Sequence, residues 1–90
     1  MINKKPNISQ DIIFRWLKTK LMDHLSIEKH LIQADLSLFD AGISSVWIIK
    51  LVGELEEWLG IELDPDALFE YPTLGELSDL LFKLYTDEQE

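Results

Sequence analysis

The chain has 90 residues, a net charge of −9 and no cysteine. Its apolar content of 47% is enough to build the core of one small domain and argues against disorder throughout. The lack of cysteine excludes disulfides, zinc–thiolate sites, iron–sulfur clusters and a cysteine nucleophile. The longest uninterrupted apolar run covers residues 46–49, far fewer than the roughly 20 residues that cross a bilayer, and no signal-peptide pattern begins the chain. We therefore expect a cytoplasmic protein that does not enter the membrane.

The charge is unevenly distributed along the chain. Residues 1–31 hold six basic and three acidic side chains, whereas residues 32–90 hold two basic and fourteen acidic ones. A surface this negative repels nucleic acid and anionic lipid and attracts basic patches on protein partners. The alternative is that the acidic residues serve only solubility.

The first helix is predicted after a flexible, polar tail of residues 1–8. Ser9 or Asp11 can cap its start, and apolar residues then recur every four positions. These residues are Ile13, Leu17, Leu21 and Leu25. The next stretch, residues 26–39, keeps no clean period, so we expect a long ordered loop that includes at most a helical turn. Its apolar side chains should hold it to the core; they are Leu31, Ile32, Leu36, Leu38 and Phe39.

A second helix is predicted over residues 45–59, with Gly60 as its terminator. Its inward side chains should be Ile48, Leu51, Val52, Leu55 and Leu59. Asp64-Pro65-Asp66 indicates the start of a short third helix, which Pro72 prevents from continuing.

Thr73, with Glu76 three positions later, predicts a capped last helix. Its expected buried face consists of Leu74, Leu77, Leu80, Leu81 and Leu84. No alternating strand pattern occurs. We therefore predict an all-α fold of three main helices and one short one, forming a domain over residues 9–85 that is followed by a charged tail at 86–90.

Three short motifs follow one another between residues 40 and 74 of the chain. The first is a turn, Asp40-Ala41-Gly42-Ile43-Ser44-Ser45, that leads directly into the second helix; the others are Leu-Gly-Ile-Glu-Leu at 59–63 and Leu-Phe-Glu-Tyr-Pro-Thr-Leu at 68–74. This ordered set resembles the acyl and peptidyl carrier proteins, and the last motif is most similar to carriers of polyketide synthases. The resemblance implies a four-helix carrier bundle with a long first loop.

The resemblance also implies a covalent 4′-phosphopantetheine arm on Ser45, transferred from coenzyme A. Asp40, Gly42 and Ser44 would form the attachment turn. Most members of the family have Asp where this chain has Ser44, which leaves two candidate hydroxyls. Ser45 matches the attachment position because it follows Gly42 by three residues and precedes the apolar Val46.

The partners implied by the resemblance are a phosphopantetheinyl transferase, an acyl- or aminoacyl-loading enzyme, and a ketosynthase or other tailoring enzymes. Several residues of the second helix lie off its inward face and could form a docking surface for them, with an acidic rim. The apolar ones are Val46, Trp47 and Ile49, and the acidic ones are Glu54, Glu56 and Glu57. A core or solvated role for each is the alternative.

Nothing in the sequence indicates an enzyme. His24 and His30 have no cysteine or carboxylate at ligand spacing, so we expect no metal site, and the carboxylates have no histidine partner for catalysis. We expect a monomeric, non-catalytic acyl carrier. An aminoacyl (peptidyl) carrier and an unmodified acidic helical adaptor remain the two alternatives.

Overall fold

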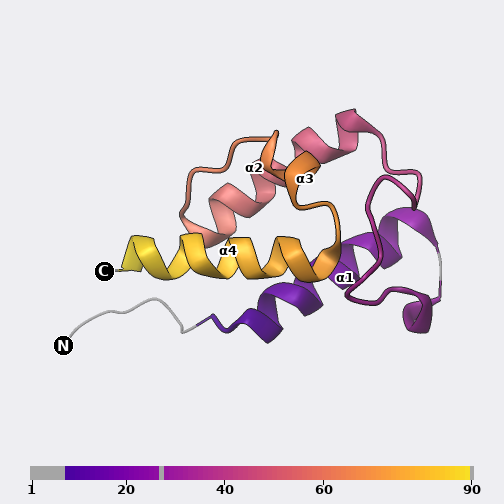
Figure 1. Ribbon diagram of the computed structural model, residues 1–90, viewed down its shortest axis with the longest axis horizontal. Helices are drawn as coiled ribbons and strands as arrows, with labels where there is room; N and C mark the ends of the chain where they lie inside the picture. The colour runs from indigo at the N-terminus through magenta and orange to yellow at the C-terminus, as the bar shows by residue number, and fades with distance from the viewer. Residues whose placement is uncertain (1–7, 27, 90) are drawn as a thin grey trace.

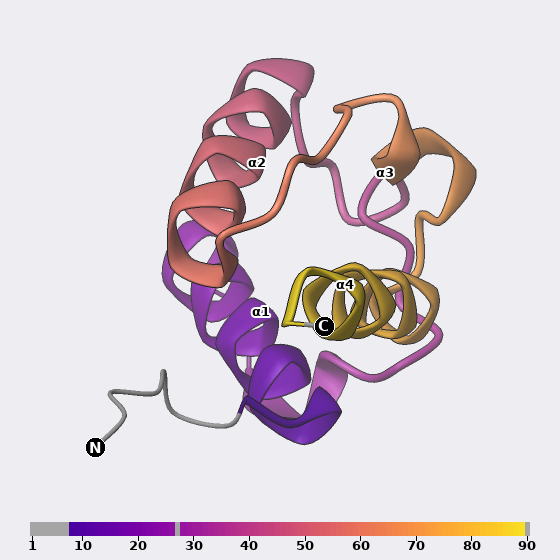
Figure 2. The ribbon, with the colours of Figure 1, turned by 90° about the vertical axis from the view of Figure 1, so that its left-hand side faces the viewer.

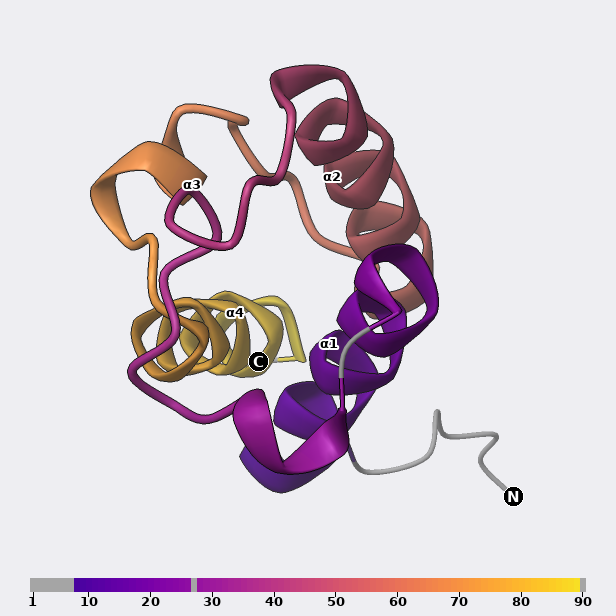
Figure 3. The ribbon, with the colours of Figure 1, turned by 90° about the vertical axis from the view of Figure 1, so that its right-hand side faces the viewer.

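The computed structural model describes residues 8–26 and 28–89, and within them it is helical, as predicted. The elements in chain order are α1 (Gln10–Leu25), the 3-10 turn η1 (Lys29–Leu31), α2 (Ser45–Leu59), α3 (Ala67–Glu70) and α4 (Leu74–Gln89). In Figure 1, α2 and α3 lie above α4. Figures 2 and 3 view the molecule from its two ends and show α1 and α2 along one side, with α3 on the other.

Side-chain caps fix where the helices begin. The Ser9 hydroxyl accepts the Ile12 N–H at 3.2 Å, which decides between the two predicted caps of α1. The Thr73 hydroxyl accepts the Glu76 N–H at 3.2 Å and donates to the Glu76 carboxylate at 3.0 Å. The predicted pairing of Thr73 with Glu76 is therefore confirmed. In a capping box the glutamate carboxylate usually accepts the backbone N–H of the capping residue, whereas here it accepts the hydroxyl of Thr73.

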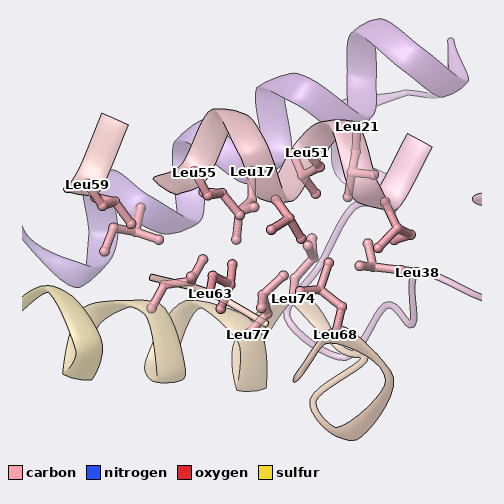
Figure 4. Packing of buried hydrophobic residues seen from close by; sticks show 14 of the residues in the cluster. Leu17, Leu21, Leu38, Leu51, Leu55, Leu59, Leu63, Leu68, Leu74 and Leu77 are labelled. Atoms are coloured by element: carbon pink, nitrogen blue, oxygen red, sulfur yellow. The ribbon is translucent and has the colours of Figure 1, made fainter. Parts of the chain in front are cut away.

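The core is formed by one face of each main helix together with parts of the long loop, as Figure 4 shows for its leucines. All five residues of the predicted inward face of α2 are buried. In α4 the buried face differs from the predicted one, because Tyr85 is 5% exposed while Leu80 and Leu84 are only partly buried. Tyr85 lies four residues after Leu81, so it continues the buried row one turn further than the leucines alone indicated.

The loop between α1 and α2 is held to the start of α4 by backbone hydrogen bonds. The Leu38 N–H donates to the Pro72 carbonyl at 2.9 Å, and the Gly75 N–H donates to the Ala34 carbonyl at 2.8 Å. Ile32 and Leu38 are fully buried, as predicted. Leu31 was predicted to anchor the loop, but this prediction is wrong: it ends η1 with its side chain 56% exposed.

The described chain includes only parts of the two predicted tails. Residues 1–7, predicted as most of a flexible tail, lie outside the described residues, and Ile8 packs against the core. Helix α4 continues to Gln89, so residues 86–89 of the predicted charged tail are helical. Within the described residues, none of the helices is long and apolar enough to cross a membrane.

Candidate functional site

The turn before α2 is built by three consecutive backbone hydrogen bonds. The N–H groups of Ala41, Gly42 and Ile43 donate to the carbonyls of Ser37, Phe39 and Leu38 at 3.0, 3.1 and 3.2 Å. Gly42 has φ +85°, a conformation that residues with a Cβ rarely adopt, whereas the space around it is open. The glycine is therefore needed for the path of the backbone, which buries Ile43 and delivers the next two residues to the surface.

Ser44 and Ser45 have different roles at the start of α2. Ser44 is the N-cap, and its Oγ accepts the Trp47 N–H at 3.3 Å. Ser45 is the first helical residue; its side chain is exposed, and its hydroxyl has no hydrogen-bond partner among the described residues. Of the two candidate hydroxyls, only that of Ser45 is available to react without breaking a cap.

The position of Ser45 suits a phosphodiester. The first N–H groups of a helix have no intrahelical acceptor, and the helix dipole makes this end attractive to negative charge. An exposed serine oxygen here has the chemistry that covalent attachment of a phosphopantetheine group requires. Asp40 lies in the same turn with its side chain exposed, and within residues 8–26 and 28–89 no hydrogen bond joins it to Ser45.

The apolar residues predicted beside Ser45 separate into two kinds. Val46 and Ile49 project into solvent, with 77% and 61% of their surfaces exposed. Trp47 is only partly exposed, because its ring stacks on that of His24 in α1, with centroids 4.4 Å apart and planes 17° apart.

The three glutamates predicted as an acidic rim also differ. Glu54 forms an ion pair with Lys20 of α1 at 3.0 Å. The Glu56 carboxylate accepts the Leu63 N–H at 2.8 Å and so fixes the chain that follows α2. Glu57 is exposed and has no hydrogen bond or ion pair among the described residues.

A second apolar feature was not predicted as part of the site. Phe39, before the attachment turn, stacks on Phe69 of α3, with centroids 4.8 Å apart and planes 18° apart. Phe69 is 54% exposed, and its neighbour Tyr71 is also exposed. Helix α3 has only four residues and Leu68 occupies its buried side, so Phe69, the next residue, faces outward. The aromatic residue directly after Leu68 was therefore the signal in the sequence for an exposed ring beside the turn.

No group of three or more histidine or acidic side chains that could hold a metal ion occurs in the described part of the chain.

The chain is similar to proteins of one known family. A family model described as phosphopantetheine attachment site matches residues 15–81. Polyketide synthase PksL of Bacillus subtilis is 33% identical over 70 residues, which cover 78% of this chain and 2% of that protein. The non-reducing polyketide synthase terA of Aspergillus terreus is 32% identical over 65 residues, or 71% of this chain and 3% of that protein. The chain thus spans a very small part of these relatives.

Solved structures agree with the fold. An acyl carrier protein from Anabaena sp. PCC 7120 with a variant phosphopantetheinylation-site sequence has a TM-score of 0.76 and is 32% identical, covering 94% of this chain and 97% of its own. A free-standing peptidyl carrier protein from Acinetobacter baumannii has a TM-score of 0.75 at 24% identity, covering 93% of this chain and all of its own, and at that identity it supports the fold alone.

The family model extends from α1 through the turn before α2 and well into α4. The chain belongs to the phosphopantetheine-binding carrier proteins, is related to the carrier domains of polyketide synthases, and has covalent 4′-phosphopantetheine as its cofactor.

Proposed function

We propose that Ser45 is the attachment residue and that the chain carries an acyl group as a thioester on the arm. The observation that carries this proposal is the division of labour between the two serines: the Ser44 Oγ is engaged as the N-cap, while the Ser45 hydroxyl is exposed and without a partner in the described structure. A phosphopantetheinyl transferase would remove the Ser45 proton, join the oxygen to the phosphorus of the pantetheine half of coenzyme A, and release adenosine 3′,5′-bisphosphate.

Ser44 in place of the usual Asp is compatible with this role. Serine and aspartate are both good N-cap residues, so the exchange keeps the geometry of the first turn and removes one negative charge. The Anabaena acyl carrier protein, which has a variant phosphopantetheinylation-site sequence of its own, supports the view that this fold tolerates departures at the site.

The chain supplies position and recognition, and its partners supply the chemistry. Because the sequence has no cysteine, the thiol of the arm would be the only thiol in the molecule. Acyl groups attached elsewhere as thioesters are therefore not possible, and loading is confined to one atom. The polyketide synthase relatives favour an acyl rather than an aminoacyl cargo and a role in polyketide assembly.

Partner enzymes would dock on the surface formed by Val46 and Ile49, with Glu57 further along α2 to meet basic side chains. Apolar side chains that are exposed close together on a surface are typical of sites of protein–protein interaction. The proposal narrows the predicted surface, since Trp47 and Glu56 are engaged within the fold.

The loading reaction tests the acyl assignment. The chain is first converted with coenzyme A and a broad-specificity transferase, and the product is then incubated with either an acyl-transferring or an amino-acid-activating enzyme. Transfer of an acyl group alone supports the proposal. Loading only by the amino-acid-activating enzyme would assign the chain to peptidyl carriers. A chain that gains no arm but still binds a partner would be an unmodified adaptor.

A further inference from the structure

Two aromatic stacks join α1 to α2, one at each end of α2. At the end of α2, Trp58 stacks on Trp16 with centroids 4.8 Å apart and planes 16° apart. At its start, Trp47 stacks on His24 with centroids 4.4 Å apart. The two contacts are alike in geometry, but only the second one lies within the helical turn that carries Ser45.

The first turn of α2 has few other attachments to the fold. Of the four residues after Ser45, Val46 and Ile49 face solvent, whereas Ile48 is buried and Trp47 packs against the core. Ile48 is buried and points into the core, whereas Trp47 contacts α1 at the side. The buried Ile48 fixes how deeply the turn sits in the core, and the contact of Trp47 with α1 prevents the turn from rotating about the helix axis.

The backbone of Trp47 also belongs to the cap. Its N–H is the donor to the Ser44 Oγ at 3.3 Å, and the next N–H, that of Ile48, donates to the Ser44 carbonyl at 3.1 Å. A shift of Trp47 and Ile48 relative to Ser44 would lengthen both bonds and move Ser45, which lies between these residues. The side chain of Trp47 is thus connected to the reactive hydroxyl through a short chain of contacts.

We infer that Trp47, held by His24, is a positioning residue that fixes the direction of the Ser45 hydroxyl for the transferase. The inference rests on the proposed function, in which Ser45 is the acceptor. Since attack on phosphorus requires an aligned oxygen, a first turn that rotates freely would slow the reaction of the bound carrier more than it would weaken binding.

The surroundings of the stack indicate that it can be altered without loss of the core. Charged side chains from both helices line a small cavity of about 190 Å³ beside it; they are Lys20 and Asp23 of α1 and Lys50 and Glu54 of α2. His24 is exposed, whereas Trp47 is partly buried, packs against the edge of the core and lines this cavity together with Leu51. Replacement of Trp47 by leucine therefore keeps an apolar side chain at the edge of the core and removes the stack on His24.

The test compares four variants by steady-state kinetics of phosphopantetheinyl transfer, with the carrier as the varied substrate. Trp47→Leu is expected to lower kcat about tenfold with KM within about twofold, because it removes alignment and leaves Val46 and Ile49 unchanged. His24→Ala should lower kcat in the same direction, and Trp47→Phe, which can still stack, should retain most of it. Trp58→Leu is the matched control at the far end and should leave kcat unchanged.

Amide hydrogen exchange of the free carrier gives a second readout that does not involve the transferase. The Ile48 N–H should exchange faster in Trp47→Leu and His24→Ala than in the wild type, and at the wild-type rate in Trp58→Leu. The inference is overturned if Trp47→Leu raises KM alone with exchange unchanged, which would make Trp47 a docking residue. It is also overturned if Trp58→Leu lowers kcat equally.

The proposed function fails separately. If the wild type gains no phosphopantetheine while a reference carrier does, Ser45 is not an acceptor, and the exchange data alone then decide whether Trp47 anchors the turn.

Discussion

Ser44 and Ser45 are adjacent in the sequence, yet the structure gives their hydroxyls opposite environments. The Ser44 Oγ accepts the Trp47 N–H at 3.3 Å, and the Ser45 Oγ faces solvent at the first position of α2. The difference follows from the helix boundary, since the N-cap side chain turns back toward the helix and the N1 side chain does not.

Replacement of Ser44 tests the cap. Ser44→Ala removes the acceptor of the Trp47 N–H and should lower the free energy of unfolding by about 1 kcal/mol, whereas Ser44→Asp should keep it within about 0.5 kcal/mol of the wild type. Urea denaturation followed by circular dichroism measures both. Equal stability of Ser44→Ala and wild type would show that the cap contributes nothing.

The two glutamates near the end of α2 should differ in their effect on stability. Glu56→Ala leaves the Leu63 N–H without its acceptor and should cost about 1–2 kcal/mol of unfolding free energy. Glu57→Ala, one residue later and exposed, should change it by less than about 0.5 kcal/mol. The same urea denaturation experiment measures both changes. A larger loss of unfolding free energy in Glu57→Ala than in Glu56→Ala would contradict the roles given to these two residues.

The exposed apolar side chains beside Ser45 should affect recognition and leave stability unchanged. Val46→Ser or Ile49→Ser is expected to raise the KM of the transferase for the carrier about tenfold, because each removes an apolar contact from the proposed docking surface. The control is Leu31→Ser, which removes another exposed apolar side chain, 56% accessible, from η1. An equal rise in KM for Leu31→Ser would argue against a localised surface.

Two helical glycines provide a test of packing. A Cβ at Gly53 of α2 would meet no atom within 4 Å, so Gly53→Ala should raise the free energy of unfolding by up to about 1 kcal/mol through helix propensity alone. A Cβ at Gly75 of α4 would lie 3.2 Å from both the Cβ and the carbonyl oxygen of Ala34.

The Ala34 carbonyl cannot easily move away, because it accepts the Gly75 N–H at 2.8 Å. Gly75→Ala should therefore not show the increase in stability that we expect for Gly53→Ala. It should destabilise the fold and lower the midpoint of thermal unfolding. Stabilisation by both substitutions would show that the long loop is not packed tightly against α4.

The helices could be predicted from the sequence because their signals are local. The four-residue period from Ile13 to Leu21, the glycine that ends α2, and the pairing of Thr73 with Glu76 all depend on neighbours within one or two turns. The same holds for the attachment turn, where Gly42 and the capping serine occur within a few residues of Ser45. The all-α architecture followed from these patterns, and they also led to the prediction that Ser45 is the site of attachment.

Contacts between distant segments could not be predicted in this way. The stacks of His24 on Trp47 and of Phe39 on Phe69 depend on how whole elements pack, and each changes the role of a residue near Ser45. Leu31 is as apolar as the buried Ile32, and only the direction of η1 exposes it. The bond from the Leu63 N–H to Glu56 likewise requires the chain after α2 to turn back along the helix.

The central claim is that the arm is attached to Ser45, and intact mass tests it most directly. Wild type, Ser45→Ala and Ser44→Ala are incubated with coenzyme A and a broad-specificity phosphopantetheinyl transferase, beside a reference carrier. The account predicts the mass of one phosphopantetheine on wild type and on Ser44→Ala, and none on Ser45→Ala. Modification of Ser45→Ala, or loss of modification in Ser44→Ala while it remains folded, would contradict it.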